Sequence, residues 1–140
     1  MNKQKGFTII ELIVVIAIIA VLAAVVLVNV TAYLNKGRDA AIKGNMSGLM
    51  TNAAVYFDAN GNYTNFCANS SVSAALTEAK RAYGDVGGNT ADCNSNATEW
   101  AACSQLKSSD VYFCVDSTGV KKEISTRTTC VANWSATACP

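Results

Sequence analysis

Residues 5–31 read KGFTIIELIVVIAIIAVLAAVVLVNVT, and this stretch decides how the rest of the chain is interpreted. No polar side chain occurs from Leu12 to Val28, and counted from Phe7 the apolar run reaches the roughly 20 residues that cross a bilayer core. Lys3 and Lys5 precede the run, and positive residues keep their end of a membrane helix in the cytoplasm. The sequence therefore predicts a single-pass segment that leaves the remainder of the chain outside the cytoplasm.

A secretory signal peptide does not account for this segment. Such a peptide has an apolar core of about 7 to 15 residues that ends at a small-residue cleavage site. Here the run is longer, and it continues into further helical sequence. The apolar segment is therefore expected to remain in the mature protein.

Glu11 lies four residues inside the apolar segment. A carboxylate there costs about 2.5–3.5 kcal/mol on insertion scales, and such an acid is by default functional. The alternative is an acid that snorkels to the nearby cytoplasmic interface. A cut after Gly6 would give Phe7 a free amino group one helical turn from Glu11. We expect these two charges to pair, within a chain or between staggered neighbouring chains.

The stretch Lys5-Gly6-Phe7-Thr8-Ile9-Ile10-Glu11-Leu12-Ile13 resembles the class III leader and cleavage region of type IV prepilins and pseudopilins. The resemblance implies that a membrane prepilin peptidase cleaves between Gly6 and Phe7 and N-methylates Phe7. It also implies that Glu11 meets the N-terminus of an adjacent subunit during assembly. One departure is the lack of the proline that many members carry late in this helix, so local unwinding would depend on β-branched residues and Gly37.

Helical periodicity continues beyond the membrane segment. Apolar side chains recur at alternating spacings of four and three, which is the pattern of an amphipathic helix; they are Ile42, Met46, Leu49, Ala53 and Phe57. One helix is predicted from about Phe7 to Asp58, ended by a turn at Asn60-Gly61. The acids and amides of this turn faintly resemble a calcium loop, but Gly61 is out of register with an EF-hand glycine, so no metal site is expected.

Four segments are expected in the chain. They are a leader peptide that is removed (1–6), a transmembrane or filament-core helix (7–30), the amphipathic half of the same helix (31–58) and a disulfide-rich globular head (59–140). Within the head, apolar residues recur at helical spacing from Val72 to Tyr83, and Gly84 is suited to end that helix. After a polar stretch, 87–96, three strand-like pieces follow at Trp100–Leu106, Val111–Val115 and Val120–Ile124, and they predict an antiparallel meander.

The fold class that these elements and the resemblance imply is α+β. It is the pilin fold, in which one long N-terminal helix packs on a small antiparallel sheet in a disulfide-stapled head. Small residues in the apolar half would let such helices approach one another closely in a filament; they are Ala17, Ala20, Ala23 and Ala24.

All six cysteines lie C-terminal to the apolar segment, at Cys67, Cys93, Cys103, Cys114, Cys130 and Cys139. An even number behind a membrane segment indicates disulfides formed outside the cytoplasm. A zinc site is the alternative, but the chain has no histidine and no CxxC pair. The pairing is left open by the sequence. A bond between Cys130 and Cys139, closing the terminal loop, would resemble the C-terminal disulfide region of many pilins.

The composition disfavours an enzyme. Without histidine no Ser/His/Asp set can form, and no glycine-rich phosphate loop is present, so no cofactor is expected. A formal net charge of +1 gives no basic surface for nucleic acid. The acids beyond the apolar segment are expected to be solvated surface charges; they are Asp39, Asp58, Glu78, Asp85, Asp92, Glu99, Asp110, Asp116 and Glu123.

The resemblance implies a structural subunit of a type IV pilus-like filament. Its partners would be further copies in a helical homo-oligomer, the prepilin peptidase, and an assembly machinery with a separate ATPase. The precursor would lie in the inner membrane and the assembled filament at the cell surface. Cell adhesion, motility and protein secretion all fit such a filament.

Two other interpretations are weighed against this one. Within the same family, the chain could be a pseudopilin or minor pilin of a type II secretion or DNA-uptake system, although six cysteines favour a surface filament. From another class, a monomeric membrane-anchored binding module or enzyme would leave Glu11 and the Gly6-Phe7 pattern without a role.

Overall fold

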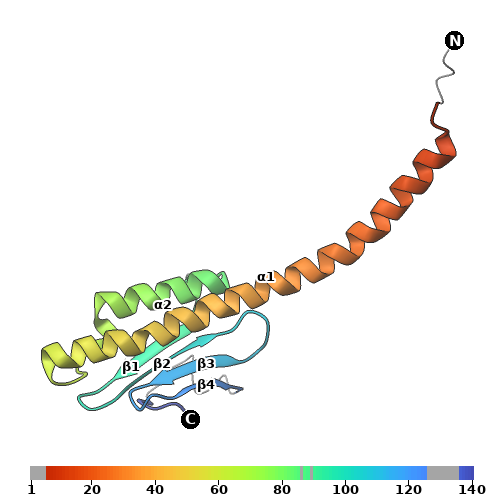
Figure 1. Cartoon of the computed structure of the whole chain (residues 1–140). Coiled ribbons are helices and arrows are strands. Elements are labelled where there is room, and N and C mark those ends of the chain that lie inside the picture. Colours follow the sequence, from red (N-terminus) through yellow and green to blue (C-terminus); the bar gives the residue numbers. More distant parts are fainter. Residues whose placement is uncertain (1–5, 86, 89, 126–135) are drawn as a thin grey trace. The chain divides into compact units, whose positions relative to one another are not determined.

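The computed structural model describes residues 6–85, 87–88, 90–125 and 136–140. Its elements are, in chain order, α1 (Ile9–Asn60), the short 3₁₀ helix η1 (Phe66–Ala68), α2 (Ser70–Tyr83), β1 (Ala91–Ser95), β2 (Trp100–Gln105), β3 (Tyr112–Asp116) and β4 (Lys121–Ile124) (Figure 1). The four strands form one antiparallel sheet in the order β1-β2-β3-β4. The predicted α+β, pilin-like fold is confirmed.

The chain divides after Leu34 into two units, which are described separately. The first unit contains the beginning of α1, and its described large apolar side chains between Phe7 and Leu34 are 45% to 85% exposed. By length and composition α1 is the one helix among the described residues that could cross a membrane. Since burial of one such side chain stabilises by about 1.5–3 kcal/mol, this surface strongly favours an apolar partner, either lipid or other helices.

In the second unit, α1 from Asn35 onward supplies one side of the core. Ile42, Met46, Leu49 and Ala53 are buried, as their spacing predicted. Phe57 is an exception, because its side chain is 44% exposed and packs on the Tyr63 ring with centroids 5.0 Å apart.

Two glycines end the helices where the sequence predicted turns. Gly61, just after α1, has a φ of 71° and donates its N–H to the Phe57 carbonyl at 2.7 Å. Gly84, after α2, has a φ of 93° and donates to the carbonyls of Lys80 and Arg81. Both positions have the left-handed backbone that glycine adopts without a Cβ clash.

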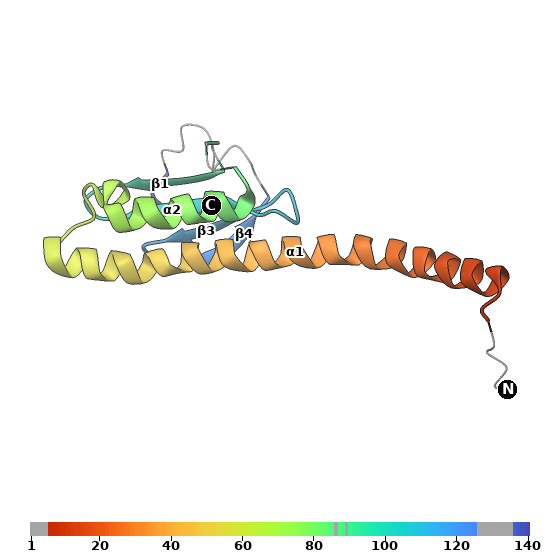
Figure 2. The ribbon, with the colours of Figure 1, turned by 90° about the horizontal axis from the view of Figure 1, so that it is seen from above.

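Trp100 is the largest fully buried side chain, and it joins the helices to the sheet. Its ring contacts Phe66, with centroids 5.0 Å apart, and Phe66 in turn meets the edge of Tyr56. Ala102 and Leu106 point into the same core, as their alternation with Trp100 predicted. The helix α2 lies beside the second half of α1 and contacts β1 and β2 (Figure 2).

The polar stretch 87–96 was expected to be a connection, and that expectation is corrected in part. Residues Ala91–Ser95 form β1, which pairs with β2 in the register Cys93↔Ala102. Aspartate and asparagine have low strand propensity, so the side chains gave no strand signal. The strand instead depends on its main-chain hydrogen bonds to β2 and on the disulfide between Cys93 and Cys67 of η1.

Two disulfides among the described residues staple the second unit. They join Cys67 to Cys93 and Cys114 to Cys139, with Cα–Cα distances of 5.6 Å and 5.9 Å. Cys103 is also disulfide-bonded, and Cys130 lies outside the described residues. The expected bond between Cys130 and Cys139 is therefore wrong. Cys139 instead lies against the sheet face opposite to the helices, where Cys114 of β3 is buried.

Asp116, at the end of β3, holds the chain's last residues against the sheet. Its Oδ1 accepts hydrogen bonds from the Thr118 hydroxyl at 2.7 Å and the Thr118 N–H at 2.9 Å, and its Oδ2 accepts from the Cys139 N–H at 2.9 Å. Burial raises the pKa of Asp116, but these bonds, with one from the Val120 N–H, outweigh it and lower the pKa below the usual aspartate range.

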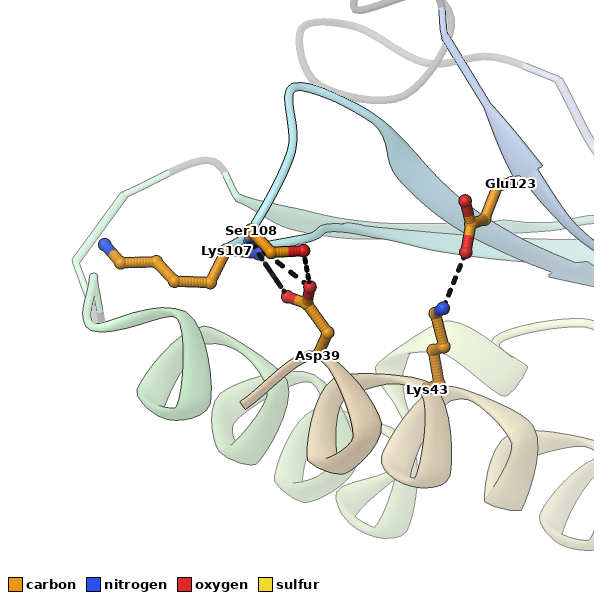
Figure 3. A network of polar contacts seen from close by, with 5 residues as sticks. All are labelled: Asp39, Lys43, Lys107, Ser108 and Glu123. Atoms are coloured by element: carbon orange, nitrogen blue, oxygen red, sulfur yellow. Dashed lines mark hydrogen bonds and ion pairs between the residues drawn. The ribbon is translucent and has the colours of Figure 1, made fainter. Parts of the chain in front are cut away.

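Asp39 attaches α1 to the loop between β2 and β3. The carboxylate is 6% exposed and accepts hydrogen bonds from the N–H groups of Lys107 and Ser108 and from the Ser108 hydroxyl (Figure 3). Nearby, Lys43 and Glu123 form an ion pair at 2.6 Å, but the two side chains are 38% and 51% exposed, so this pair contributes little to stability.

Asp39 and Asp116 were both expected to be surface charges, and for these two acids that expectation is wrong. Each carboxylate can be buried because it accepts hydrogen bonds from main-chain N–H groups of a loop. Without the carboxylate, these N–H groups would have no partner among the described residues. Paired in this way, a buried carboxylate is satisfied without a counter-ion.

We predict that Asp39→Ala lowers the free energy of unfolding by about 2–3 kcal/mol, because the N–H groups of Lys107 and Ser108 lose their charged acceptor. Urea denaturation of the full chain in detergent, followed by Trp fluorescence, measures this change. Asp58→Ala is the matched control, since it removes an exposed acid from the same helix. Equal stability of the two variants would contradict the role of Asp39.

The lowered pKa of Asp116 predicts a loss of stability in acid. An unfolded aspartate has a pKa of about 3.9. The stabilisation from Asp116 is therefore complete above that pH and is lost as the pH falls through the lower pKa of the folded state. Melting temperatures measured from pH 7 to pH 2 should fall less steeply below about pH 4 for Asp116→Asn than for the wild type or for Asp58→Asn. Parallel curves for all three would refute this assignment.

Candidate assembly site at the start of the long helix

Thr8 and Glu11 form a reciprocal cap at the start of α1. The Thr8 N–H and the Thr8 hydroxyl both donate to Glu11 Oε2, each at 2.8 Å, and the Glu11 N–H donates to Thr8 Oγ1 at 3.3 Å. This is the capping box, in which a residue before the helix and an acid three positions later satisfy each other's N–H groups. Glu11 therefore has a local structural role in addition to any pairing with another chain.

The predicted cleavage site lies just outside the helix. Gly6, Phe7 and Thr8 have non-helical backbone, and α1 begins at Ile9. The Phe7 side chain is exposed. The remainder of the predicted leader, with Lys3 and Lys5, lies outside the described residues. The Gly6–Phe7 bond lies before the first residue of the helix.

The electrostatics at the helix start favour a carboxylate. Glu11 is the only acid or base from residue 6 to residue 34, and it lies in the first turn, where the helix dipole is positive. Among the described residues only Oε2 of Glu11 accepts hydrogen bonds, all from Thr8. Oε1 is left to accept from a cation or another donor.

Two polar side chains further along the same helix are satisfied by the backbone. The Asn29 side-chain amide donates to the Val25 carbonyl, and the Thr31 hydroxyl donates to the Leu27 carbonyl, both at 3.2 Å. Such bonds to the carbonyl four residues earlier let polar groups lie in an apolar environment without water. Sequence reasoning noted the missing proline in this region but not these contacts.

Within the described ranges, no group of three or more His, Cys, Asp or Glu side chains is placed to hold a metal ion. At the start of α1, one carboxylate in an apolar surface can recognise a positive or hydrogen-bond-donating group.

Residues 1–27 match the family model of the prokaryotic N-terminal methylation motif. The chain carries this motif. It contains Gly6, Phe7, Thr8 and Glu11, so the methylation motif and the capping box share the same residues. Sequence reasoning singled out Gly6, Phe7 and Glu11 but missed the cap formed by Thr8. The pattern T-x-x-E ahead of an apolar run is a signal that could have found it.

Two curated proteins of Moraxella bovis are similar to part of the chain. They are the type IV major alpha-pilin and fimbrial protein Q, each 47% identical over 47 residues. The match covers 34% of this chain and 30% of each relative, so the chain spans less than a third of the length of these relatives. No solved structure matches the chain. The resemblance to type IV pilins is confirmed over this part of the chain.

Proposed function

We propose that the chain is a structural subunit of a type IV pilus-like filament, assembled from a membrane-held precursor that is cut between Gly6 and Phe7. The observation that carries this proposal is the first half of α1, which is apolar and exposed on every face and is headed by one capped acid. The methylation motif over the same residues and the partial similarity to pilins support it.

The precursor would be held in the inner membrane by residues 7–30, with residues 59–140 outside the cytoplasm. Removal of residues 1–6 by a prepilin peptidase creates an α-amino group at Phe7, which the enzyme then methylates. In the filament, helices of neighbouring copies replace lipid around the apolar surface. A separate ATPase supplies the energy, because the chain has no nucleotide-binding motif.

Glu11 would select the correct neighbour. In the capping box its Oε2 is engaged by Thr8, so Oε1 is the atom that can accept from the ammonium group of an adjacent Phe7. In an apolar surrounding, a charge-assisted hydrogen bond of this kind is short and strong. A subunit placed out of register would leave both charges unpaired, which is costly away from water.

Mass spectrometry of filaments sheared from cells tests the proposal. The expected result is a dominant chain that begins with N-methylated Phe7. The same processed chain at low abundance beside another major subunit would instead favour a minor pilin, and its confinement to the cell envelope would favour a pseudopilin. A mature chain that begins at Met1, or a soluble monomer, would overturn the proposal.

Two substitutions at Glu11 separate its cap role from its charge role. Glutamine at this position of a capping box keeps the bond to the N–H of the cap residue. Glu11→Gln should therefore keep the helix start but lose the negative charge. We predict that Glu11→Gln and Glu11→Ala are both inserted and cut, and that both lose most surface fibres when sheared pilin is quantified. Normal fibre yield in Glu11→Gln, with loss only in Glu11→Ala, would show that Glu11 acts as a cap and not as a charge partner.

A further inference from the structure

A groove of about 450 Å³ lies where the end of α1 meets the start of α2. These two segments are side by side in both ribbon views (Figures 1 and 2). Val55, Tyr56 and Ala59 line it together with the polar residues Asn52, Asn60, Asn69 and Ser71. The volume is in the range of small-molecule sites, which combine an apolar lining with a few placed polar groups.

Two of the amides are held in one orientation. The Asn60 Nδ2 donates to the Tyr56 carbonyl at 2.8 Å, which leaves its Oδ1 as an acceptor. The Asn69 Oδ1 caps α2 by accepting from the N–H and hydroxyl of Ser71 at 2.9 Å and 2.8 Å, which leaves its Nδ2 as a donor. Asn52 is half-buried, and among the described residues its amide has no hydrogen-bond partner. The groove thus presents both donors and acceptors in fixed places.

The Tyr56 ring is also fixed. Its hydroxyl donates to the Thr64 carbonyl at 2.6 Å, and its ring meets Phe66 in an edge-to-face contact with centroids 5.4 Å apart. A half-buried aromatic ring held in this way is a rigid surface for C–H groups of a ligand. Rigid contact groups reduce the entropy lost on binding.

The lining residues carry no formal charge. The groove therefore has no counter-ion for a phosphate, a carboxylate or an ammonium group. A sugar ring fits this chemistry, because its hydroxyls donate and accept around its edge while its faces carry C–H groups. We propose that this groove binds a neutral saccharide of one or two rings, with the amides of Asn52, Asn60 and Asn69 at the hydroxyls and the Tyr56 ring against a face.

Binding at this groove does not depend on assembly. If the proposed filament forms, every copy repeats the site, and a surface that bears several such sugars would be held by many weak contacts at once. Such multivalent binding exceeds the affinity of one site by about 10²–10⁴.

The test uses the full chain in a detergent without a sugar headgroup, labelled with ¹⁵N and titrated with glucose, galactose, N-acetylglucosamine, N-acetylgalactosamine and their β1-4-linked disaccharides. At least one of these sugars should shift the NMR signals of residues 52–71, with weak affinity and saturation. Signals of β3 and β4 should not move. If no sugar shifts residues 52–71 up to its solubility limit, the proposal is overturned.

Matched variants locate the binding. Ala59→Trp fills the groove, and Ala54→Trp places the same side chain at an exposed position of the same helix outside the lining. Ala59→Trp and Asn52→Ala should weaken binding about tenfold or more, since each removes space or a hydrogen bond, while Ala54→Trp should leave it unchanged. Equal binding by all three variants would overturn the site. Shifts of residues 52–71 that follow protein concentration and not sugar would show a contact between copies of this chain, and would overturn it as well.

Discussion

The central constraint on this molecule is that one continuous helix has two different surfaces. Up to Leu34 the apolar side chains of α1 are exposed all round, whereas from Asn35 onward one face is buried in a core and the other faces outward. A helix that is apolar on every face needs an apolar medium or other helices around it. The same backbone therefore links a segment that favours lipid or other helices to one that packs into a core of its own.

The second unit has a small core. Among the described residues its core contains one tryptophan, Trp100, and many of its other buried side chains are small, such as Ala53, Ala79, Ala101 and Ala102. Small cores of this kind are commonly supplemented by disulfides. Here the bonds Cys67–Cys93 and Cys114–Cys139 lie on different sides of the sheet. The buried carboxylates of Asp39 and Asp116 also hold loops in place by accepting hydrogen bonds from main-chain N–H groups. Burial of apolar side chains is therefore not the only interaction that stabilises this unit.

The sequence was sufficient where side-chain type alone sets the structure. Spacing in the sequence predicted the buried face of the second half of α1. It also predicted the helix α2, which ends at Gly84, and the alternation of buried residues that starts at Trp100. The sequence was insufficient where the determining contact is made by the backbone or across a long sequence distance. The strand β1 is held by its ladder to β2, and Asp39 is buried by a loop 68 residues away along the chain.

The candidate site shows the same division. Gly6, Phe7 and Glu11 were found from their order in the sequence, because a short motif is local by nature. The capping role of Thr8 is equally local, and the T-x-x-E spacing could have predicted it. The partner of Cys139 was not accessible to spacing, since Cys114 and Cys130 are both present and only the position of β3 against the last residues separates them.

The strand order β1-β2-β3-β4 also has a consequence for how the protein is made. The strands β2, β3 and β4 each pair with the strand that precedes them in the chain, so each hairpin can close as soon as its second strand has emerged. The contacts that need distant residues, such as the one between Asp39 and Ser108, come only after β2 is complete. The helix α1 therefore emerges before the sheet exists, and its amphipathic face stays uncovered until the strands that follow it have paired.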